Sequence, residues 1–232
     1  MHRSGQEKAN CRDCSEKSCA AAVLNPNEVS VVDENSREAA FRKGDIIIHE
    51  GSMTSHIIYL KSGLVKEYQK GPNDKEQILQ IIKKHTYLGL PSLFGDRVNH
   101  YSYAALADIT VCYIDVNVFT QLIRQNGNFA YEILVSVSRD SLTNFHRFMN
   151  QSQKKTYGRV ADALLYFSGI IFESKTFEIP FSRQEFADLV GISRESSTRV
   201  LTKFREEGIL RLDGRTIEIV DPGLLQQISK NG

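Results

Sequence analysis

Short runs of β-branched and apolar residues, separated by glycine, occupy the chain between about Phe41 and Asp115. Runs such as "DIIIHEG", "SHIIYLKSG" and "ADITVCYID" have the length and composition of β-strands. Glycines stand at the ends of these runs, where turns use backbone conformations that other residues avoid; they are Gly44, Gly51, Gly63, Gly71 and Gly89. The pattern predicts a compact antiparallel β-roll or jelly roll.

The pattern changes to helical spacing between about Val116 and Gln153. No proline interrupts this stretch, Gly127 is its only glycine, and apolar residues recur three and four positions apart. The recurring residues are Leu134, Val137, Leu142, Phe145, Phe148 and Met149. A long helix with such a stripe favours pairing with a second copy of itself, which would make the stripe a dimer seam. The alternative is that the stripe covers the β-roll of its own chain.

The most specific motif is "FSRQEFADLVGISRESSTRVLTKFREEGILRLDGRTIEIV" near the C-terminus. Ser182 with Glu185 three residues later forms a capping box that begins a short helix, and Gly191 ends it. Ser193 begins a second helix, and the dipeptide "DG" joins two short strands that follow. This order predicts a winged helix-turn-helix, whose second helix enters the DNA major groove. The alternative is a helical corner and hairpin with no role in DNA binding.

The second helix of this motif has one face suited to packing and another suited to reading bases. The packing face carries Ser197, Val200, Leu201 and Phe204, and the exposed face carries Arg194, Glu195, Thr198 and Arg199. Residues 192–205 hold four basic residues and one acidic residue, a local charge of +3. We expect Lys203, Arg205 and the hydroxyl of Ser182 to contact phosphates rather than bases.

Composition limits the class of protein. The chain has 232 residues, of which 41% are hydrophobic and 25% charged, and this size favours two modest domains. No apolar run approaches the roughly 20 residues of a membrane span, and the polar start "MHRSGQEKAN" lacks a signal core. We therefore expect a cytoplasmic protein without a membrane partner, and thiols that stay free or bind metal. No catalytic constellation accompanies a motif, so we predict that the chain is not an enzyme.

Together these motifs resemble the Crp/Fnr superfamily of bacterial transcription regulators over nearly the whole chain. Arg194, Glu195 and Arg199 match the family's Arg-Glu-x-x-x-Arg pattern, and "FRKGDIIIHEG" with "HIIYLKSGLVK" resembles its first β-roll turns. The resemblance implies an α+β fold: a cyclic-nucleotide-binding-like β-roll, a long dimerisation helix and a C-terminal winged helix-turn-helix. It also implies a homodimer that binds double-stranded DNA and works with RNA polymerase. The expected parts are a cysteine-rich arm (1–24), the β-roll (25–120), the dimerisation helix (121–153) and the DNA-binding domain (154–232).

The recognition helix predicts a target sequence. An arginine can bond guanine O6 and N7, and a glutamate can accept from cytosine N4, so Arg199 and Glu195 can read the two sides of one G·C pair. The resemblance places this pair in a TGA core, with Thr198 where the family usually has Gly or Ser. Arg194 stands where the cyclic-AMP branch has an arginine that reads an additional guanine. We therefore predict an inverted repeat of GTGA-like half-sites; contact of Arg194 with phosphate alone is the alternative.

The β-roll departs from the branch that binds cyclic AMP. Members of that branch share a Gly-Glu pair followed by an Arg-Ser pair. The corresponding stretch of this chain is "YLGLPSLFGDRVNHYSYAAL". Leu90 takes the glutamate position, and His100 and Tyr101 fall nearest to the Arg-Ser pair. A cyclic phosphate without its arginine loses its strongest contact, so we expect no control by cyclic AMP.

The cysteines resemble those of the oxygen-sensing Fnr branch, which holds a [4Fe–4S] cluster on three clustered cysteines and a distant one. Here "CRDCSEKSC" supplies Cys11, Cys14 and Cys19, and "DITVCYID" supplies Cys112. Four thiolates also suit structural zinc. We expect an intact cluster to favour one packing of the helices at residues 130–150, placing two recognition helices about 34 Å apart. The alternatives are control by a small ligand or haem in the β-roll, with the cysteines incidental, and an iron–sulfur enzyme or carrier.

Overall fold

The computed structural model describes residues 7–8, 11–12, 14–71 and 76–232, and the chain divides into two compact units. One unit comprises Met1–Gln69 and Ile81–Leu142, and the other comprises Lys70–Gln80 and Thr143–Gly232. The expected arm of residues 1–24 lies partly outside the described residues. Within the described ranges, no helix has the length and apolar character needed to cross a membrane.

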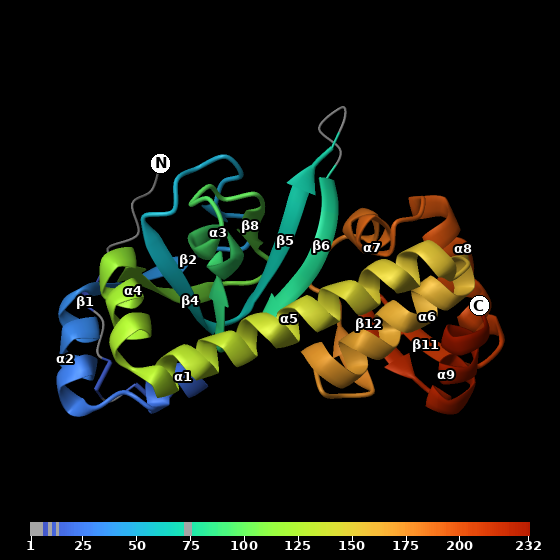
Figure 1. Cartoon of the computed structure of the whole chain (residues 1–232). Helices are drawn as coiled ribbons and strands as arrows, with labels where there is room; N and C mark the ends of the chain where they lie inside the picture. Colours follow the sequence, from blue (N-terminus) through green and yellow to red (C-terminus); the bar gives the residue numbers. More distant parts are fainter. Residues whose placement is uncertain (1–6, 9–10, 13, 72–75) are drawn as a thin grey trace. The chain divides into compact units, whose positions relative to one another are not determined.

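Two sheets form the β-roll (Figure 1). The five-stranded sheet has the order β1 (Glu7–Lys8), β2 (Ser36–Phe41), β9 (Ile109–Asp115), β4 (His56–Ser62) and β7 (Thr86–Leu88). The four-stranded sheet has the order β3 (Ile46–Ile48), β8 (Ser102–Ala105), β5 (Leu64–Lys70) and β6 (Glu76–Lys83). Strand pairs β2–β9, β4–β9, β4–β7, β3–β8 and β5–β8 are antiparallel, which confirms the expected β-roll.

One apolar cluster fills the β-roll, and a glycine turn closes one of its hairpins. The cluster includes Leu60, Val65, Leu88 and Val111, all at most 1% exposed. Gly63 joins β4 to β5 with φ +82°, and a Cβ there would lie 2.7 Å from the Ile109 side chain. This turn therefore requires glycine.

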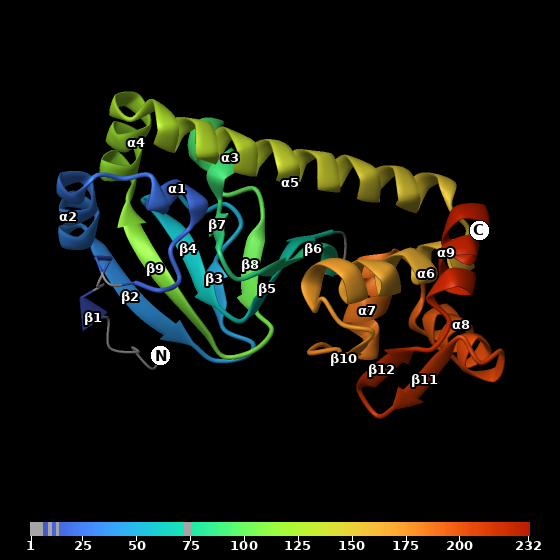
Figure 2. The ribbon, with the colours of Figure 1, turned by 90° about the horizontal axis from the view of Figure 1, so that it is seen from below.

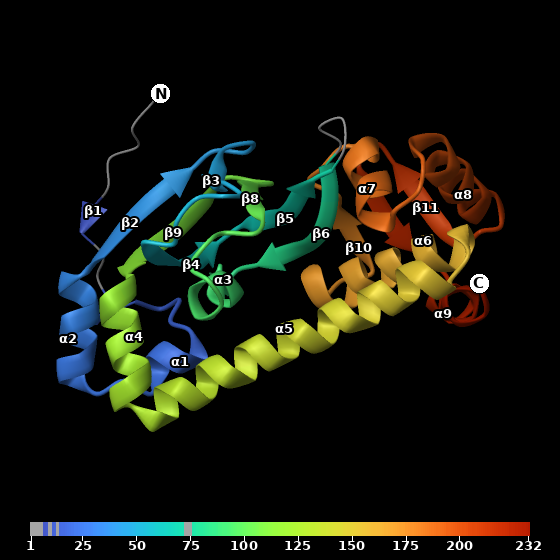
Figure 3. The ribbon, with the colours of Figure 1, turned by 45° about the horizontal axis from the view of Figure 1, so that its top comes forward.

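Helices cover the outer face of the five-stranded sheet. They are α1 (Cys19–Ala22), α2 (Pro26–Glu34), α4 (Val116–Gln125) and the first turns of α5 (Gly127–Gln153), and α3 (Leu90–Phe94) follows β7. Figure 3 shows α2 and α4 side by side. A capping box between Asn25 and Glu28 begins α2. The second apolar cluster lies under these helices and contains Tyr59, Tyr87, Cys112, Phe119, Leu122, Phe129 and Ile133, among others.

The single helix expected over residues 121–153 is divided in the structure between α4 and α5. Asn126 adopts an extended backbone with φ −116° and ψ 101°. Its side-chain oxygen accepts the N–H of Phe129 at 3.0 Å, so Asn126 caps the start of α5. Local capping therefore overrides the continuous apolar pattern.

The second unit contains the winged helix-turn-helix. Its elements are α6 (Thr156–Tyr166), a π-helix η2 (Phe167–Ile171), β10 (Thr176–Glu178), α7 (Arg183–Val190), α8 (Arg194–Glu206), β11 (Leu210–Asp213), β12 (Thr216–Ile219) and α9 (Pro222–Asn231). The three strands pair in the order β10-β12-β11 (Figure 2). Phe167 lies at the centre of the core, with ring contacts to Phe172, Phe177, Phe181 and Phe186. The winged helix-turn-helix predicted from the sequence is confirmed.

Candidate functional site

Local hydrogen bonds fix both helices of the helix-turn-helix. Ser182 Oγ accepts the N–H of Glu185 at 3.2 Å, and the Glu185 carboxylate accepts the N–H of Ser182 at 2.8 Å. Gly191 ends α7 with φ +70°, in the left-handed region. Ser193 then caps α8 by accepting the N–H of Ser196 at 3.1 Å. The capping box, glycine turn and second cap lie where the sequence predicts them.

The two faces of α8 are separated as expected. The packing face is buried and consists of Ser197, Val200, Leu201 and Phe204. The side chains of Arg194, Glu195, Thr198 and Arg199 are exposed, and with Ser193 they line one open hollow in the surface. The Thr198 hydroxyl donates to the Arg194 carbonyl at 2.9 Å. The exposed face thus presents two guanidinium groups and a carboxylate to an approaching ligand.

The residues expected to contact phosphates are also exposed. Lys203 forms an ion pair with Glu207 of 3.2 Å between Nζ and Oε1, one helical turn further along. Arg205 is exposed on the same helix, and Ser182 is exposed at the start of α7, with its oxygen already used by the cap. Phosphate contact by Ser182 would therefore use its hydroxyl hydrogen.

Most of the apolar stripe on α5 faces solvent in the single chain. Leu134, Leu142, Phe145, Phe148 and Met149 have exposed fractions between 45% and 68%. Nothing in the described part of the chain covers most of the surface of these large apolar side chains, as a face reserved for a partner requires. Val137 is different: one turn after the buried Ile133, it packs partly against the apolar cluster of the first unit.

Three of the four cysteines meet in one cavity. Cys11 and Cys14 from the arm and Cys112 from β9 line a cavity of about 60 Å³, with almost wholly apolar walls that include Phe119 and Phe129. This volume exceeds the roughly 10–15 Å³ that one water molecule needs. Cys19 is exposed at the first position of α1, next to the lining residue Ser18. Among the described residues, no three potential metal ligands already stand at coordinating distance.

A row of residues across the sheet makes one wall of this cavity. Tyr87 on β7 is the register partner of Tyr59 on β4, and Tyr59 is the partner of Cys112 on β9. Register partners project from the same face of a sheet, so both rings and the thiol point toward the arm. The two rings lie 5.0 Å apart between centroids.

Burial determines the protonation of two of the thiols. Burial, with help from Asp33, raises the pKa of Cys11 to about 11. Burial also raises the pKa of Cys112 to about 12, although the nearby Lys61 ammonium acts in the opposite direction. Both thiols are therefore protonated at neutral pH, and metal binding there would release protons.

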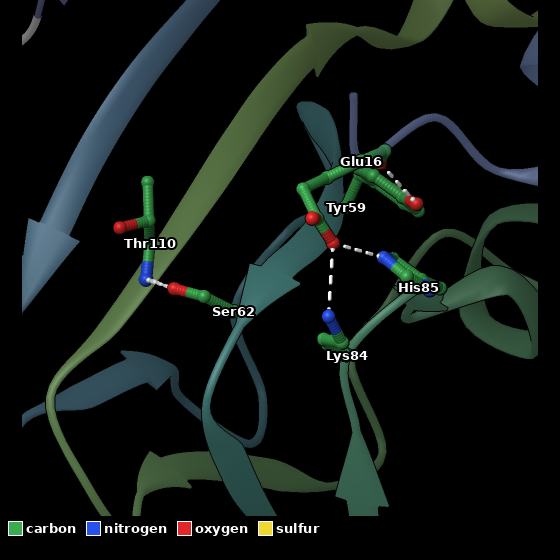
Figure 4. Close-up of polar contacts among 6 residues, drawn as sticks. All are labelled: Glu16, Tyr59, Ser62, Lys84, His85 and Thr110. Carbon is green, nitrogen blue, oxygen red and sulfur yellow. Dashed lines mark hydrogen bonds and ion pairs between the residues drawn. The ribbon is translucent and has the colours of Figure 1, made fainter. Parts of the chain in front are cut away.

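Contacts that the sequence did not reveal hold the arm against the sheet (Figure 4). Tyr59 donates its hydroxyl to the Glu16 carbonyl at 2.7 Å. The Glu16 carboxylate pairs with Lys84 Nζ at 3.1 Å and with His85 Nε2. These two hydrogen-bonded partners lower the pKa of Glu16, the bond from His85 first. The pairing of β4 with β7 brings Tyr59 close to the turn that carries Lys84 and His85, and residues far apart in the sequence set this pairing.

The residues at the positions that bind cyclic nucleotide in the cyclic-AMP branch are chemically different in this chain. Leu90, at the glutamate position, is 2% exposed in the apolar cluster under the helices. His100 is exposed and pairs with Asp96, 2.9 Å between Nε2 and Oδ2. Within the β-roll, Tyr103 donates its hydroxyl to the buried Glu67 carboxylate at 2.7 Å. No arginine stands at the position where the cyclic-AMP branch binds phosphate.

Comparison with known proteins identifies the family. Residues 38–126 match the cyclic nucleotide-binding domain, and residues 158–228 match the Crp-like helix-turn-helix domain. The chain belongs to the Crp/Fnr family of transcription regulators. Like other Crp/Fnr regulators, it carries a DNA-binding helix-turn-helix, in which α8 is the second helix.

Individual Crp/Fnr relatives match along most of the chain. The transcriptional activator protein FnrA of Stutzerimonas stutzeri is 24% identical over 222 residues, covering 93% of this chain and 91% of FnrA. The fumarate and nitrate reduction regulatory protein of Vibrio cholerae is 25% identical over 235 residues, covering 98% and 93%. The structure of FixK2 from Bradyrhizobium japonicum has a TM-score of 0.76 at 19% identity, covering 83% and 96%. This structural likeness supports the shared fold.

Proposed function

We propose that this Crp/Fnr regulator binds an inverted repeat as a homodimer and senses oxygen or redox state through a [4Fe–4S] cluster on its cysteines. The observation that carries the proposal is the cavity lined by Cys11, Cys14 and Cys112. The arm and β9 are almost a hundred residues apart in sequence, and the fold brings their thiols to one place. The similarity to FnrA and to the Vibrio cholerae regulator supports the same function.

The donor chemistry of the residues present fits such a group. Cysteine sulfur in an apolar surrounding is the usual ligand of iron–sulfur clusters, and the cavity offers three thiols that would bind as thiolates after losing their protons. Cys19 would be the fourth ligand, because it directly follows Ser18, which lines the cavity. When bound, a [4Fe–4S] cluster would supply redox chemistry that oxygen can reach, since the arm lies at the surface.

A chain of aromatic contacts connects the cavity to the dimerisation helix. The Tyr87 ring lies 5.4 Å from that of Phe119 on α4, and Phe119 lies 5.4 Å from Phe129 in the first turn of α5. Tyr87, Phe119 and Phe129 also line the cavity, so a group that fills the cavity would contact all three rings. Filling the cavity would thereby act on the helix that carries the exposed apolar stripe.

Dimerisation would cover that stripe and place two copies of α8 on one face of DNA. An isologous interface repeats each contact twice, so a palindromic site follows from the symmetry of the protein. In each half-site Arg199 and Glu195 would read one G·C pair, and Arg194 an additional guanine. Cyclic AMP has no place in this proposal, because Leu90 and His100 replace the polar cassette.

Single replacement of Cys11, Cys14, Cys19 or Cys112 by Ser tests the sensing proposal. Each variant should lose the visible absorbance of anaerobically purified protein and the oxygen dependence of DNA binding, while its far-ultraviolet circular dichroism stays unchanged. A haem Soret band in the parent protein would instead favour control through the β-roll. Oxygen-independent DNA binding by the parent would also contradict the proposal.

A further inference from the structure

Two tyrosine hydroxyls hold alternate residues of the cysteine-bearing arm. Tyr59 donates to the carbonyl of Glu16 at 2.7 Å, and the Tyr87 hydroxyl lies 2.7 Å from Ser18 Oγ. The bond between Tyr87 and Ser18 is buried. Because Tyr59 and Tyr87 are register partners on neighbouring strands, their spacing is fixed by the sheet and not by the arm.

The side chain of Glu16 adds a second attachment at the same residue. Its carboxylate pairs with Lys84 and His85, in the turn between β6 and β7. That turn is itself fixed, because the His85 N–H donates to the Leu60 carbonyl at 2.7 Å. The backbone of His85 has φ +70°, as a tight turn requires. Glu16 is thus held by β4 through its carbonyl and by the turn through its carboxylate (Figure 4).

These attachments lie between the cysteines. Residues 16 and 18 fall between Cys14 and Cys19, and Tyr59 is directly opposite Cys112 in the sheet. The Tyr59 side chain, whose hydroxyl bonds to residue 16, therefore lies beside the Cys112 thiol. The hydrogen bonds from Tyr59 and Tyr87 join residues 16 and 18 to the sheet on which Cys112 lies, in addition to the pairing of β1 with β2 nearer the start of the arm.

We propose that Tyr59, Tyr87 and Glu16 are positioning residues that clamp the arm on the sheet and so preorganise its cysteines opposite Cys112 before any metal binds. The role of the clamp in holding a cluster rests on the proposed function. The contacts that form the clamp are made by the chain alone. Preorganisation reduces the ordering that ligand binding must supply. Loss of the clamp should therefore expose Cys14 and weaken retention of a bound cluster.

Alkylation of the metal-free protein tests the clamp directly. Native protein, reduced and treated with a chelator under nitrogen, is reacted with iodoacetamide, and labelling of each cysteine is followed by peptide mass spectrometry. In Tyr59→Phe the rate at Cys14 should rise about fivefold, the factor that corresponds to one ordinary hydrogen bond. The rate at Cys112, which is 8% exposed and faces the arm across the cavity, should rise as well.

Tyr113→Phe is the matched control. Tyr113 is the neighbour of Cys112 on β9, so its side chain points to the other face of the sheet. It should leave the rate at Cys14 unchanged. An equal rise in Tyr113→Phe, or no rise in both Tyr59→Phe and Glu16→Ala, would overturn the clamp.

Exchanging the charges of Glu16 and Lys84 distinguishes the contribution of their ion pair from a general loosening of the arm. Glu16→Lys and Lys84→Glu should each accelerate labelling of Cys14, and the double variant should return toward the parent rate because the pair re-forms with reversed charges. Additive acceleration in the double variant would overturn the role of the ion pair.

The cluster is then tested separately. Parent and Tyr59→Phe proteins are reconstituted with iron and sulfide under nitrogen, and the decay of visible absorbance is followed in aerated buffer. The decay should be about fivefold faster in Tyr59→Phe, by the same loss of one hydrogen bond. A parent protein that takes up no cluster would refute the proposed function, while the labelling rates still decide the clamp. A stable cluster with equal decay in both proteins would refute the clamp alone.

Discussion

Under the proposed dimerisation through α5, replacing Phe145 by Glu should yield folded monomers. Phe145 is 68% exposed in the single chain and stands in the middle of the apolar stripe on α5. Because most of this side chain is exposed, the substitution removes little packing within the folded monomer, and its secondary structure should be retained. At a symmetric seam the same change occurs twice, and each new carboxylate would be desolvated without a partner.

The magnitude follows from the exposed area. A phenylalanine buries about 150–250 Å², so roughly 130 Å² of this ring is available to a partner. At about 25 cal/mol per Å² this area corresponds to about 3 kcal/mol per chain. The dimer loses up to about 6 kcal/mol, and even half of that weakens the dimer about 100-fold in Kd.

Sedimentation velocity over a concentration series measures this change. Met53→Glu is the matched control, because Met53 is 69% exposed on the β-roll and lies outside the stripe. The control should remain dimeric and bind a palindromic duplex, and Phe145→Glu should do neither. A dimeric Phe145→Glu protein, or dissociation of both variants, would refute the reasoning.

Three further predictions concern single side chains. Arg194→Ala should lose roughly 1–3 kcal/mol of binding to GTGA half-sites and little to TTGA half-sites by fluorescence anisotropy; equal weakening with a shallower salt dependence would assign Arg194 to phosphate. Ser193→Ala removes the cap of α8 and should cost about 1 kcal/mol of stability in urea unfolding; an unchanged midpoint would contradict the cap. Burial, with the nearby Glu67 carboxylate, raises the pKa of Asp140 to about 6. The folded chain then keeps a proton that the unfolded chain releases between about pH 4 and 6, so stability falls as pH rises through this window. Asp140→Asn should flatten that dependence and raise stability at pH 7; an unchanged pH profile would contradict it.

Local signals made the DNA-binding domain predictable from the sequence. Ser182, Gly191 and Ser193 act within one or two helical turns, and each does in the structure what its residue type predicts. The separation of faces on α8 also follows from helical periodicity alone. The π-helix after Tyr166 and the break at Asn126 were not predicted, since both interrupt an apolar pattern that otherwise continues.

The surroundings of the cysteines could not be predicted in the same way. Sequence spacing predicted a shared site for the cysteines, but the contacts of Tyr59, Tyr87 and Glu16 depend on the register between β4, β7 and β9. Register is set by residues far apart in the chain, so one sequence carries no local signal for it. Val137 shows the same limit, because the helical pattern alone does not tell which turns of α5 face the sheet.

Iron and sulfide analysis of anaerobically purified parent and Cys112→Ala proteins is the most direct test of the sensing account. The parent should contain iron and acid-labile sulfide in the equal amounts of a [4Fe–4S] cluster on each chain, and Cys112→Ala should contain neither at full occupancy. Stoichiometric zinc without sulfide in the parent, or a fully occupied cluster in Cys112→Ala, would contradict the account.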